Sequence, residues 1–443
     1  MSDTTMASTM AAPVTIRRAS SALNDTARVR RRYAAERRFR AYGVAAITIA
    51  LGFLAFLFYS IISQGWTAFL QTEYRLPVHF DAAVVDPDGK REQSALFAAN
   101  YPELARRAVQ QALGVETLDR PARRDLNQLL SRGVDVQLRD MVLRDPSIIG
   151  TTVTVPLLAH GNVDALLKGA IDRSIPEDRR QLNDRQLGWI DKLVAQGQAA
   201  KGFNWGLFTF GASSQPETSG LLVALVGSFY MMLIVAVLSV PLGVAAAIYL
   251  EEFAPKNRIT DVIEVNINNL AAVPSIVFGL LGLSVFINLF GLPRSAALVG
   301  GFVLTLMTLP TVIIATRAAV RAVPPSIKEA ALGVGASHQQ SILHHVLPLA
   351  MPGILTGTII GLVQALGETA PLLMIGLVAF VADVPSSPME PATALPVQIY
   401  MWASSAERGF VERTAGATMV LLMFLVCMNA VAVYLRRKFE RRW

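Results

Sequence analysis

Six long apolar stretches constrain this chain of 443 residues more than any other feature. Each reaches or exceeds the roughly 20 residues that an α-helix needs to cross the hydrocarbon core of a bilayer. They run over about 43–63, 221–250, 267–290, 296–316, 350–381 and 415–435. Only 16% of the residues are charged, against about one-quarter in ordinary globular domains. The sequence therefore predicts an all-α integral membrane protein with six transmembrane helices.

Prolines interrupt four of these stretches or lie close to them. They are Pro241, Pro274, Pro310 and Pro371. A proline lacks the backbone donor that a helix needs, and in lipid only neighbouring helices can compensate. We therefore expect kinks or breaks that are covered by protein.

Lysine and arginine are distributed unevenly about the spans. With the N-terminus inside, the inner segments carry nine of them in residues 1–41, two in 251–263, three in 317–348 and five in 436–443. The short outer loops carry one in residues 291–295 and two in 382–413. This bias of nineteen to three follows the positive-inside rule. Both termini are expected in the cytoplasm, and the net charge of +7 reflects topology rather than nucleic-acid binding or specific lipid binding. Membrane lipids are expected as the general surroundings of the spans.

The segment between the first two stretches is too polar to span a membrane. Helical patterns at 94–113 and 163–167 alternate with a β-like run at 151–158, which predicts an extramembrane mixed α/β insertion between the first and second spans. Nothing in its residues assigns it a task. The expected organisation begins with a basic, partly disordered cytoplasmic tail (1–41), a first transmembrane helix (42–64) and the insertion domain, which is expected to be periplasmic (65–218). A five-helix core (219–436) with cytoplasmic coupling helices at 324–348 and a basic cytoplasmic tail (437–443) follow.

Two short amphipathic helices are predicted between the fourth and fifth spans. Ser326 and Glu329 have the spacing of a capping box, as do Ser337 and Gln340. Gly335 lies where a left-handed helix stop is expected, and the second helix is expected to end at Pro348. Such a pair either docks a partner or packs on the protein's own membrane base.

These helices carry a resemblance to a known family. Glu329-Ala330-Ala331, Gly335 and His345-Val346-Leu347-Pro348 resemble the EAA loop of ABC importer permeases, except that His345 stands where an aliphatic residue is usual. The resemblance implies that the pair couples to an ATP-hydrolysing subunit through Glu329, Ala330, Ala331, Gly335, Leu347 and Pro348. The chain has no Gly-x4-Gly-Lys-Ser/Thr phosphate loop, so ATP hydrolysis is expected in a separate chain.

Further motifs narrow the resemblance to the phosphate permease family, PstA type, over about residues 215–440. They are Tyr249–Glu252, Asn266–Gly279, Gly367–Leu373 and Leu395–Tyr400. The family implies a type I ABC importer permease fold in the bacterial cytoplasmic (inner) membrane, and translocation of inorganic phosphate. It also implies three protein partners: a second permease (PstC type), an ATPase dimer (PstB type) and a periplasmic phosphate-binding protein (PstS type).

Glu368 is the strongest candidate for the translocation pathway. An ionisable group at this depth should face the bundle interior, where it either serves transport or locks helix packing. Family members often place arginine where this chain has Gln364. Arg317 could supply the missing charge or be a positive-inside anchor. The other candidates, which could equally be interhelical glue, are Thr369, Asn269, Ser275 and Thr311.

Two rival functions remain open at this stage. One is a permease for another oxyanion such as sulfate or molybdate, and the other is a membrane receptor that uses residues 65–218 as a ligand sensor. We expect no enzymatic activity, because the spans contain no nucleophile–base or metal-protease pattern. No catalytic residue, metal site or cofactor is predicted.

Overall fold

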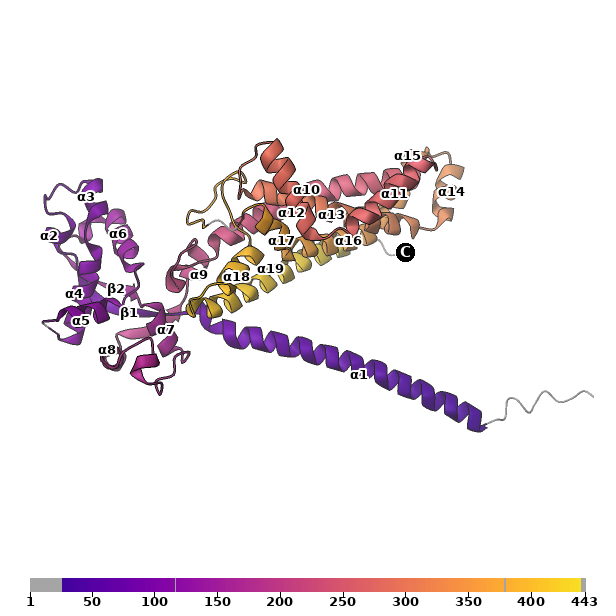
Figure 1. The fold of residues 1–443 in the computed structure, drawn as a ribbon. Helices are drawn as coiled ribbons and strands as arrows, with labels where there is room; N and C mark the ends of the chain where they lie inside the picture. Colours follow the sequence, from indigo (N-terminus) through magenta and orange to yellow (C-terminus); the bar gives the residue numbers. More distant parts are fainter. Residues whose placement is uncertain (1–25, 116, 378–379, 440–443) are drawn as a thin grey trace, which may run out of the picture. The chain divides into compact units, whose positions relative to one another are not determined.

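The computed structural model describes residues 26–115, 117–377 and 380–439 (Figure 1). It divides into two compact units, Met1–Ser60 and Ile61–Trp443. Residues 1–25 and 440–443, which include most of the tail predicted to be partly disordered, lie outside the described residues.

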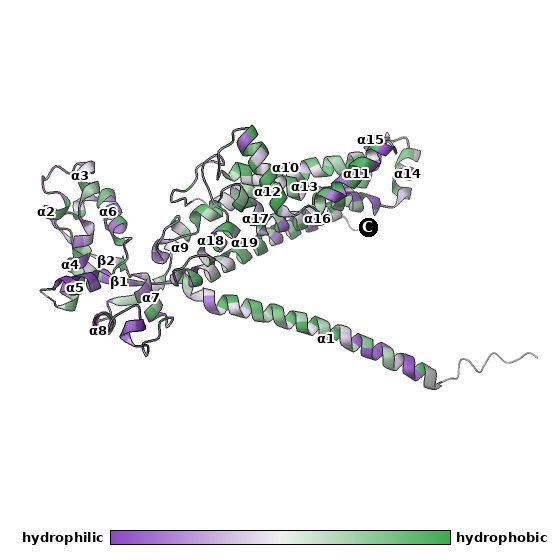
Figure 2. Ribbon diagram, in the orientation of Figure 1, coloured by the Kyte–Doolittle hydropathy of each residue, from purple (hydrophilic) through white to green (hydrophobic). Residues whose placement is uncertain are grey.

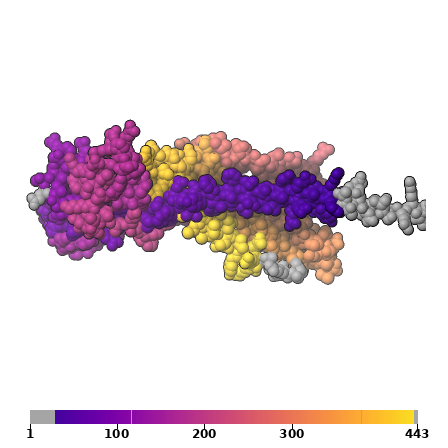
Figure 3. Space-filling model, turned by 90° about the horizontal axis from the view of Figure 1, so that it is seen from below, coloured from indigo at the N-terminus to yellow at the C-terminus, as the bar shows by residue number. Residues whose placement is uncertain are grey.

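The first unit consists, within the described residues, of most of helix α1, Thr26–Gly65. The helix begins well before the predicted span, because its first half is rich in alanine and arginine, which are strong helix formers. Figure 2 shows its hydropathy changing from polar to apolar along its length. Large side chains of its apolar half, such as Phe53 and Phe56, are exposed. Figure 3 draws the helix in space-filling form, in indigo.

The second unit begins with the insertion domain, which is built on a three-stranded antiparallel sheet. The strands are β1 (Leu70–His79), β2 (Thr152–Leu158) and β3 (Ala199–Phe203), in the order β2-β1-β3. Its helices are α2 (Ala82–Val85), α3 (Gln93–Ala98), α4 (Tyr101–Leu113), α5 (Arg120–Asn127), α6 (Val134–Arg144), α7 (Gly161–Leu167), α8 (Asp184–Ala195) and α9 (Gly206–Thr209).

Period-two burial along β1 gives this domain a core of its own. Tyr74, Leu76 and Val78 are fully buried, whereas the side chains between them are exposed. Helix α4 packs its apolar stripe, including Leu104 and Val109, into the same core. The predicted mixed α/β insertion is confirmed.

The rest of the second unit is a helical core arranged around α13. It consists of α10 (Leu222–Ile248), α11 (Arg258–Ala271), α12 (Ser275–Gly282), α13 (Ala297–Arg321), α14 (Pro325–Gly333), α15 (His338–Ser341), α16 (Leu347–Gly367), α17 (Ala370–Met374), α18 (Leu395–Ala403) and α19 (Gly409–Phe439). Wider π-helical turns extend α10 and α12 and precede α16, at Tyr249–Phe253, Leu283–Leu289 and Ile342–Val346. Helix α13 packs against both α10 and α16.

Among the described residues, five helices are long and apolar enough to cross a membrane. They contain α1, α10, α13, α16 and α19, and the bent pair α11 and α12 makes a sixth span if it is counted as one. The predicted span at 267–290, in which Pro274 was expected to cause a kink or break, corresponds to this bent pair, which begins earlier, at Arg258. The chain bends by 102° between α11 and α12, because Pro274 cannot donate a helical hydrogen bond and restricts the residue before it.

The predicted span at 350–381 also differs from the structure. Helix α16 ends at Gly367 and α17 begins at Ala370, so Glu368 and Thr369 lie in a break. The short α17 then ends at Met374, before a positive-φ glycine at Gly376. Glycine and Pro371 weaken this part of the helix, as the sequence indicated.

Candidate coupling surface and translocation pathway

Helices α14 and α15 form a compact corner at one end of the core (Figure 1). Gly335 joins them with a φ of 90°, a left-handed conformation that glycine adopts without a steric penalty. The predicted glycine turn is thus present. The second capping box is also confirmed, because Ser337 Oγ accepts from the Gln340 amide at 3.2 Å and Gln340 Oε1 accepts from the Ser337 amide at 2.9 Å.

The first predicted capping box does not form. Helix α14 starts one residue before Ser326, at Pro325, with Pro324 in the capping position and no side-chain cap. Consecutive prolines fix φ near the helical value and have no amide to satisfy, so they start the helix without help from Ser326. Glu329 is consequently an exposed side chain.

The second helix also differs from its prediction. It does not stop at Pro348 but runs from α15 through the wide turn Ile342–Val346 directly into α16. Proline in a helix removes one hydrogen bond and crowds the preceding turn, and a wide turn directly before Leu347 and Pro348 gives room for the ring. The corner is therefore continuous with the membrane helix.

The residues predicted to couple to an ATPase fall into two groups. Glu329, Ala330 and Gly335 are exposed on the corner, beside an uncovered Val334 that is 86% exposed. Ala331 is buried, while Leu347 and Pro348 are half-buried at the base of α16. The first group is accessible on the surface of the corner, whereas the residues of the second group pack beneath it.

A network of ion pairs that sequence reasoning missed joins α10, α11 and α13 and, through a second branch, the corner. Arg317 pairs with Glu251 at 3.2 Å and also with Glu264. Arg321 pairs with the same Glu251 at 2.6 Å. The three side chains on α13 and the α10 terminus thereby join α11 to the bundle. Arg317 is the buried member, with an 11% exposed side chain.

A second branch of the network reaches α14 itself. Lys328 pairs with Glu252, and His338 Nε2 lies 3.0 Å from the carbonyl oxygen of Glu252, which can only accept. The ring of Phe253 packs edge-on against His338. The sequence does show acidic residues at the end of one apolar stretch (Glu251 and Glu252) and basic residues at the end of another (Arg317 and Arg321). Their spacing along the chain does not reveal which of them form ion pairs.

The candidate pathway residues lie at the two breaks and along α13. Asn269 and Ser275 flank the bend between α11 and α12, and Glu368 and Thr369 lie between α16 and α17. Gln364 is exposed on α16. Helices α12 and α17 pass close to one another, since a Cβ on Gly279 would lie 2.7 Å from Pro371 Cα.

Thr311 and Arg317 are the two candidates on α13. Thr311 lies near Gly361 of α16, whereas Arg317 is occupied by its two glutamates. No hydrogen bond or ion pair joins the Glu368 carboxylate, which is half-buried, to any described residue. The candidate pathway residues therefore do not form a single cluster: they lie at the bend between α11 and α12, at or near the break after α16, and on α13.

Comparison with known proteins assigns the chain to a family. Residues 239–443 match the model for "Binding-protein-dependent transport system inner membrane component", and residues 26–177 match "Domain of unknown function (DUF3333)". The phosphate transport system permease protein PstA of Haemophilus influenzae is 31% identical over 244 residues, which cover 55% of this chain and 84% of that protein. This chain belongs to the PstA-type family of ABC transporter permeases.

The chain is also similar to other proteins over about half of its length. The probable ABC transporter permease protein YqgI of Bacillus subtilis is 31% identical over 262 residues, covering 56% of this chain and 88% of that protein. Among solved structures, the inward facing MetNI methionine ABC transporter aligns with a TM-score of 0.41 at 17% identity, covering 50% of this chain and 98% of that chain.

Family membership settles the coarse function. The chain is a multi-pass inner-membrane permease subunit of an ABC importer, with the type I permease fold that the motifs implied. Its relatives are transport subunits, and an ABC importer permease works with an ATPase and a substrate-binding protein.

Proposed function

We propose that this PstA-type permease translocates inorganic phosphate, with energy supplied by ATP hydrolysis in a separate chain. The observation that carries the proposal is the 31% identity to a phosphate transport permease over 84% of that protein's length. The expected partners are a second permease of PstC type, an ATPase dimer of PstB type and a periplasmic phosphate-binding protein of PstS type.

The proposed orientation puts both termini and the α14–α15 corner in the cytoplasm. The bias of lysine and arginine supports it. In this arrangement, residues 65–218 form a periplasmic domain, residues 219–436 the permease core, and the basic segments 1–41 and 437–443 the cytoplasmic tails.

The exposed part of the corner is the proposed docking surface for the ATPase. Glu329, Ala330 and Gly335 offer a small-residue face with one acidic edge, which suits insertion into a groove of a partner. Lys328 on the same helix pairs with Glu252 of the α10 terminus. A displacement of α14 by the ATPase would therefore pull on α10 through this ion pair.

The proposed pathway uses the breaks in the helices. Glu368 and Thr369 lie where α16 is interrupted, so backbone groups there are free to face a cavity. Gln364 lies one helical turn earlier on α16, and Asn269, Ser275 and Thr311 supply further hydrogen-bonding groups. Arg317 would contribute by holding α10, α11 and α13 together rather than by contacting the anion, since its guanidinium is already paired with two glutamates.

The test of coupling is phosphate uptake by proteoliposomes that contain the permease pair, the ATPase and the binding protein. Glu329→Lys and Gly335→Asp should each abolish uptake while the protein remains in the membrane. The matched control is Glu177→Lys, an exposed reversal in the insertion domain. Normal uptake by both corner variants would remove the coupling assignment.

The test of cargo is competition. Unlabelled phosphate should suppress uptake of labelled phosphate in these vesicles, whereas sulfate and molybdate should not. Suppression by sulfate or molybdate at equal concentration would identify the chain as a permease for another oxyanion.

A further inference from the structure

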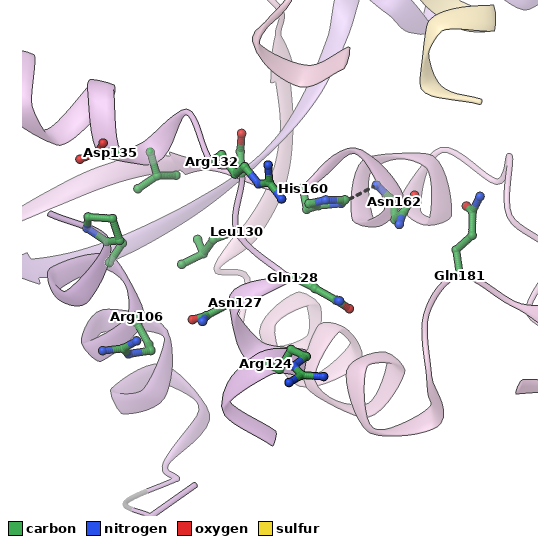
Figure 4. A pocket seen from close by; sticks show the side chains of 14 residues that line it. Arg106, Arg124, Asn127, Gln128, Leu130, Arg132, Asp135, His160, Asn162 and Gln181 are labelled. Atoms are coloured by element: carbon green, nitrogen blue, oxygen red, sulfur yellow. Dashed lines mark hydrogen bonds between the residues drawn. The ribbon is translucent and has the colours of Figure 1, made fainter. Parts of the chain in front are cut away.

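The insertion domain contains a cavity of about 820 Å³ far from the candidate pathway in the sequence. Helices α4, α5 and α6 and the start of α7 surround it (Figure 4). Its volume lies within the range of pockets that hold small molecules, roughly 300–1,000 Å³. Neither the coupling surface nor the proposed pathway uses any residue of its lining.

Positive charge dominates this lining. Arg106, Arg124 and Arg132 line the cavity against a single carboxylate, that of Asp135. Arg106 is paired with Glu103 of its own helix. Arg124 and Arg132 form no ion pair with any residue that the structure describes. Two guanidinium groups are therefore available at the cavity.

Further arginines strengthen the positive potential. Burial, followed by the charges of Arg123 and Arg107, lowers the pKa of Arg106 below its ordinary value. Like charges that converge in this way destabilise a fold by self-repulsion unless an anion binds among them. Glu103 and Asp81 already pair with Arg106 and Arg107, so the arginines of the lining without a carboxylate in ion-pair distance among the described residues are Arg124 and Arg132.

Neutral donors complete the lining. His160 Nδ1 accepts from the backbone amide of Asn162 at 3.2 Å, which leaves the opposite ring nitrogen to carry a proton. The side-chain oxygen of Gln128 accepts from Gln186 at 3.0 Å, so the amide NH₂ group of Gln128 is its remaining polar group. Figure 4 shows Arg132 next to His160 and Arg124 below Gln128.

This combination of groups selects the chemistry of the ligand. A guanidinium presents several N–H donors in a planar fork that matches the oxygens of phosphate, and uncharged donors add directional contacts. We propose that this cavity is a binding site for a small phosphoryl anion, either inorganic phosphate or a phosphate monoester, separate from the route through the membrane core. The site does not depend on which substrate the core transports.

Calorimetric titration of the purified full-length chain in nanodiscs tests the site, with inorganic phosphate, glycerol 3-phosphate and citrate as probes at fixed ionic strength. The pocket variant is Arg124→Gln with Arg132→Gln. The matched control, Arg144→Gln with Arg179→Gln, removes two exposed arginines of the same domain outside the cavity. Hydrogen–deuterium exchange over residues 120–135 and 158–163 locates the bound probe, independently of any phosphate site in the core.

At least one phosphate probe should bind the wild type and the control, with protection of both peptides. The pocket variant should bind roughly 10–100-fold more weakly. If that variant does not fold, Arg124→Lys with Arg132→Lys replaces it, and a smaller loss is expected because the charge stays and the fork is gone. Equal affinity in wild type and pocket variant, binding of citrate alone, or no binding of either phosphate probe at roughly millimolar concentration would overturn the proposal.

Discussion

Arg317 and Arg321 lie on the same helix and share Glu251, but they differ in depth. The Arg317 side chain is 11% exposed and the Arg321 side chain 59% exposed. An exposed ion pair contributes little, because water screens it and two long side chains must be ordered. A buried pair is costly to break, because the remaining charge is left without a partner. The two arginines should therefore have unequal effects on stability.

Arg317→Gln should lower the stability of the purified protein by about 3 kcal/mol, since it leaves Glu264 without its cation and Glu251 with the exposed Arg321 alone. Arg321→Gln is the matched control and should cost less than about 1 kcal/mol. Thermal unfolding in detergent, followed by circular dichroism, measures both. Equal shifts of the two midpoints would contradict the role of depth.

Glu73 carries a pH dependence at the residue scale. Burial within the sheet raises the pKa of its carboxyl above the ordinary value, and Arg75 opposes that shift. When the folded pKa is raised, the folded state binds more protons, so stability falls as pH rises through the folded pKa. Glu73→Gln should therefore raise the unfolding temperature at pH 7, and the gain should vanish as pH falls below the unfolded pKa near 4. The matched control, Glu177→Gln at an exposed position, should leave the unfolding temperature unchanged both at pH 7 and below about pH 4.

Capping residues show how far the sequence reaches at this scale. Ser337 with Gln340 formed the predicted box, whereas Ser326 with Glu329 had the same spacing and did not. The difference is Pro324 and Pro325, which start α14 before Ser326. A local motif predicts a cap only when no stronger local constraint starts the helix elsewhere.

At the scale of elements, three glycines of α16 decide how closely it approaches α13. Gly353, Gly357 and Gly361 recur every four residues, and Cβ atoms on them would lie 2.6, 2.1 and 2.9 Å from Ala319, Ala315 and Thr308. Small residues at this spacing let membrane helices pack backbone to backbone. The spacing is visible in the sequence, but only the structure identifies the partner helix.

Gly357→Ala should destabilise the core by about 1–3 kcal/mol, because the added methyl group has no room against Ala315. Gly188→Ala, in α8 of the insertion domain, is the opposite control. No atom lies within 4 Å of its added Cβ, so the helix should gain about 0.5–1 kcal/mol. The paired unfolding temperatures should move in opposite directions; a shift of the same sign in both would be inconsistent with close packing at Gly357.

The sequence predicted spans better than it predicted their interruptions. Hydropathy averages over many residues, so it recognised α10, α13 and α19 but joined α11 to α12 across Pro274. Whether a proline kinks or breaks a helix depends on neighbouring helices that replace the lost hydrogen bond. Pro241 and Pro310 lie inside continuous helices, whereas Pro274 begins a new one.

At the scale of the molecule, buried charges join the insertion domain to the membrane core within the second unit. Lys168, which follows the last residue of α7, pairs with Asp164 at 2.6 Å and with Glu412 of α19 at 2.8 Å, and its side chain is only 4% exposed. Next to it, the buried Arg413 approaches the carbonyl oxygens of Glu217 and Ser219 at 3.5 Å. Sequence reasoning found both parts but not this junction, because its partners are more than 200 residues apart in the case of Lys168 and Glu412.

Lys168→Met tests whether this junction holds the domain to α19. The substitution keeps an apolar stem of similar length but leaves the carboxylates of Asp164 and Glu412 without their cation, which should cost about 2–4 kcal/mol. Hydrogen exchange should therefore accelerate in peptides covering residues 161–168 and 409–415 while α13 stays protected. Arg173→Met removes an exposed pair with Asp191 and should leave the same peptides unchanged. If exchange rises equally in both variants, the junction owes its stability to apolar packing around Leu207, Trp402 and Phe410 rather than to the buried charges.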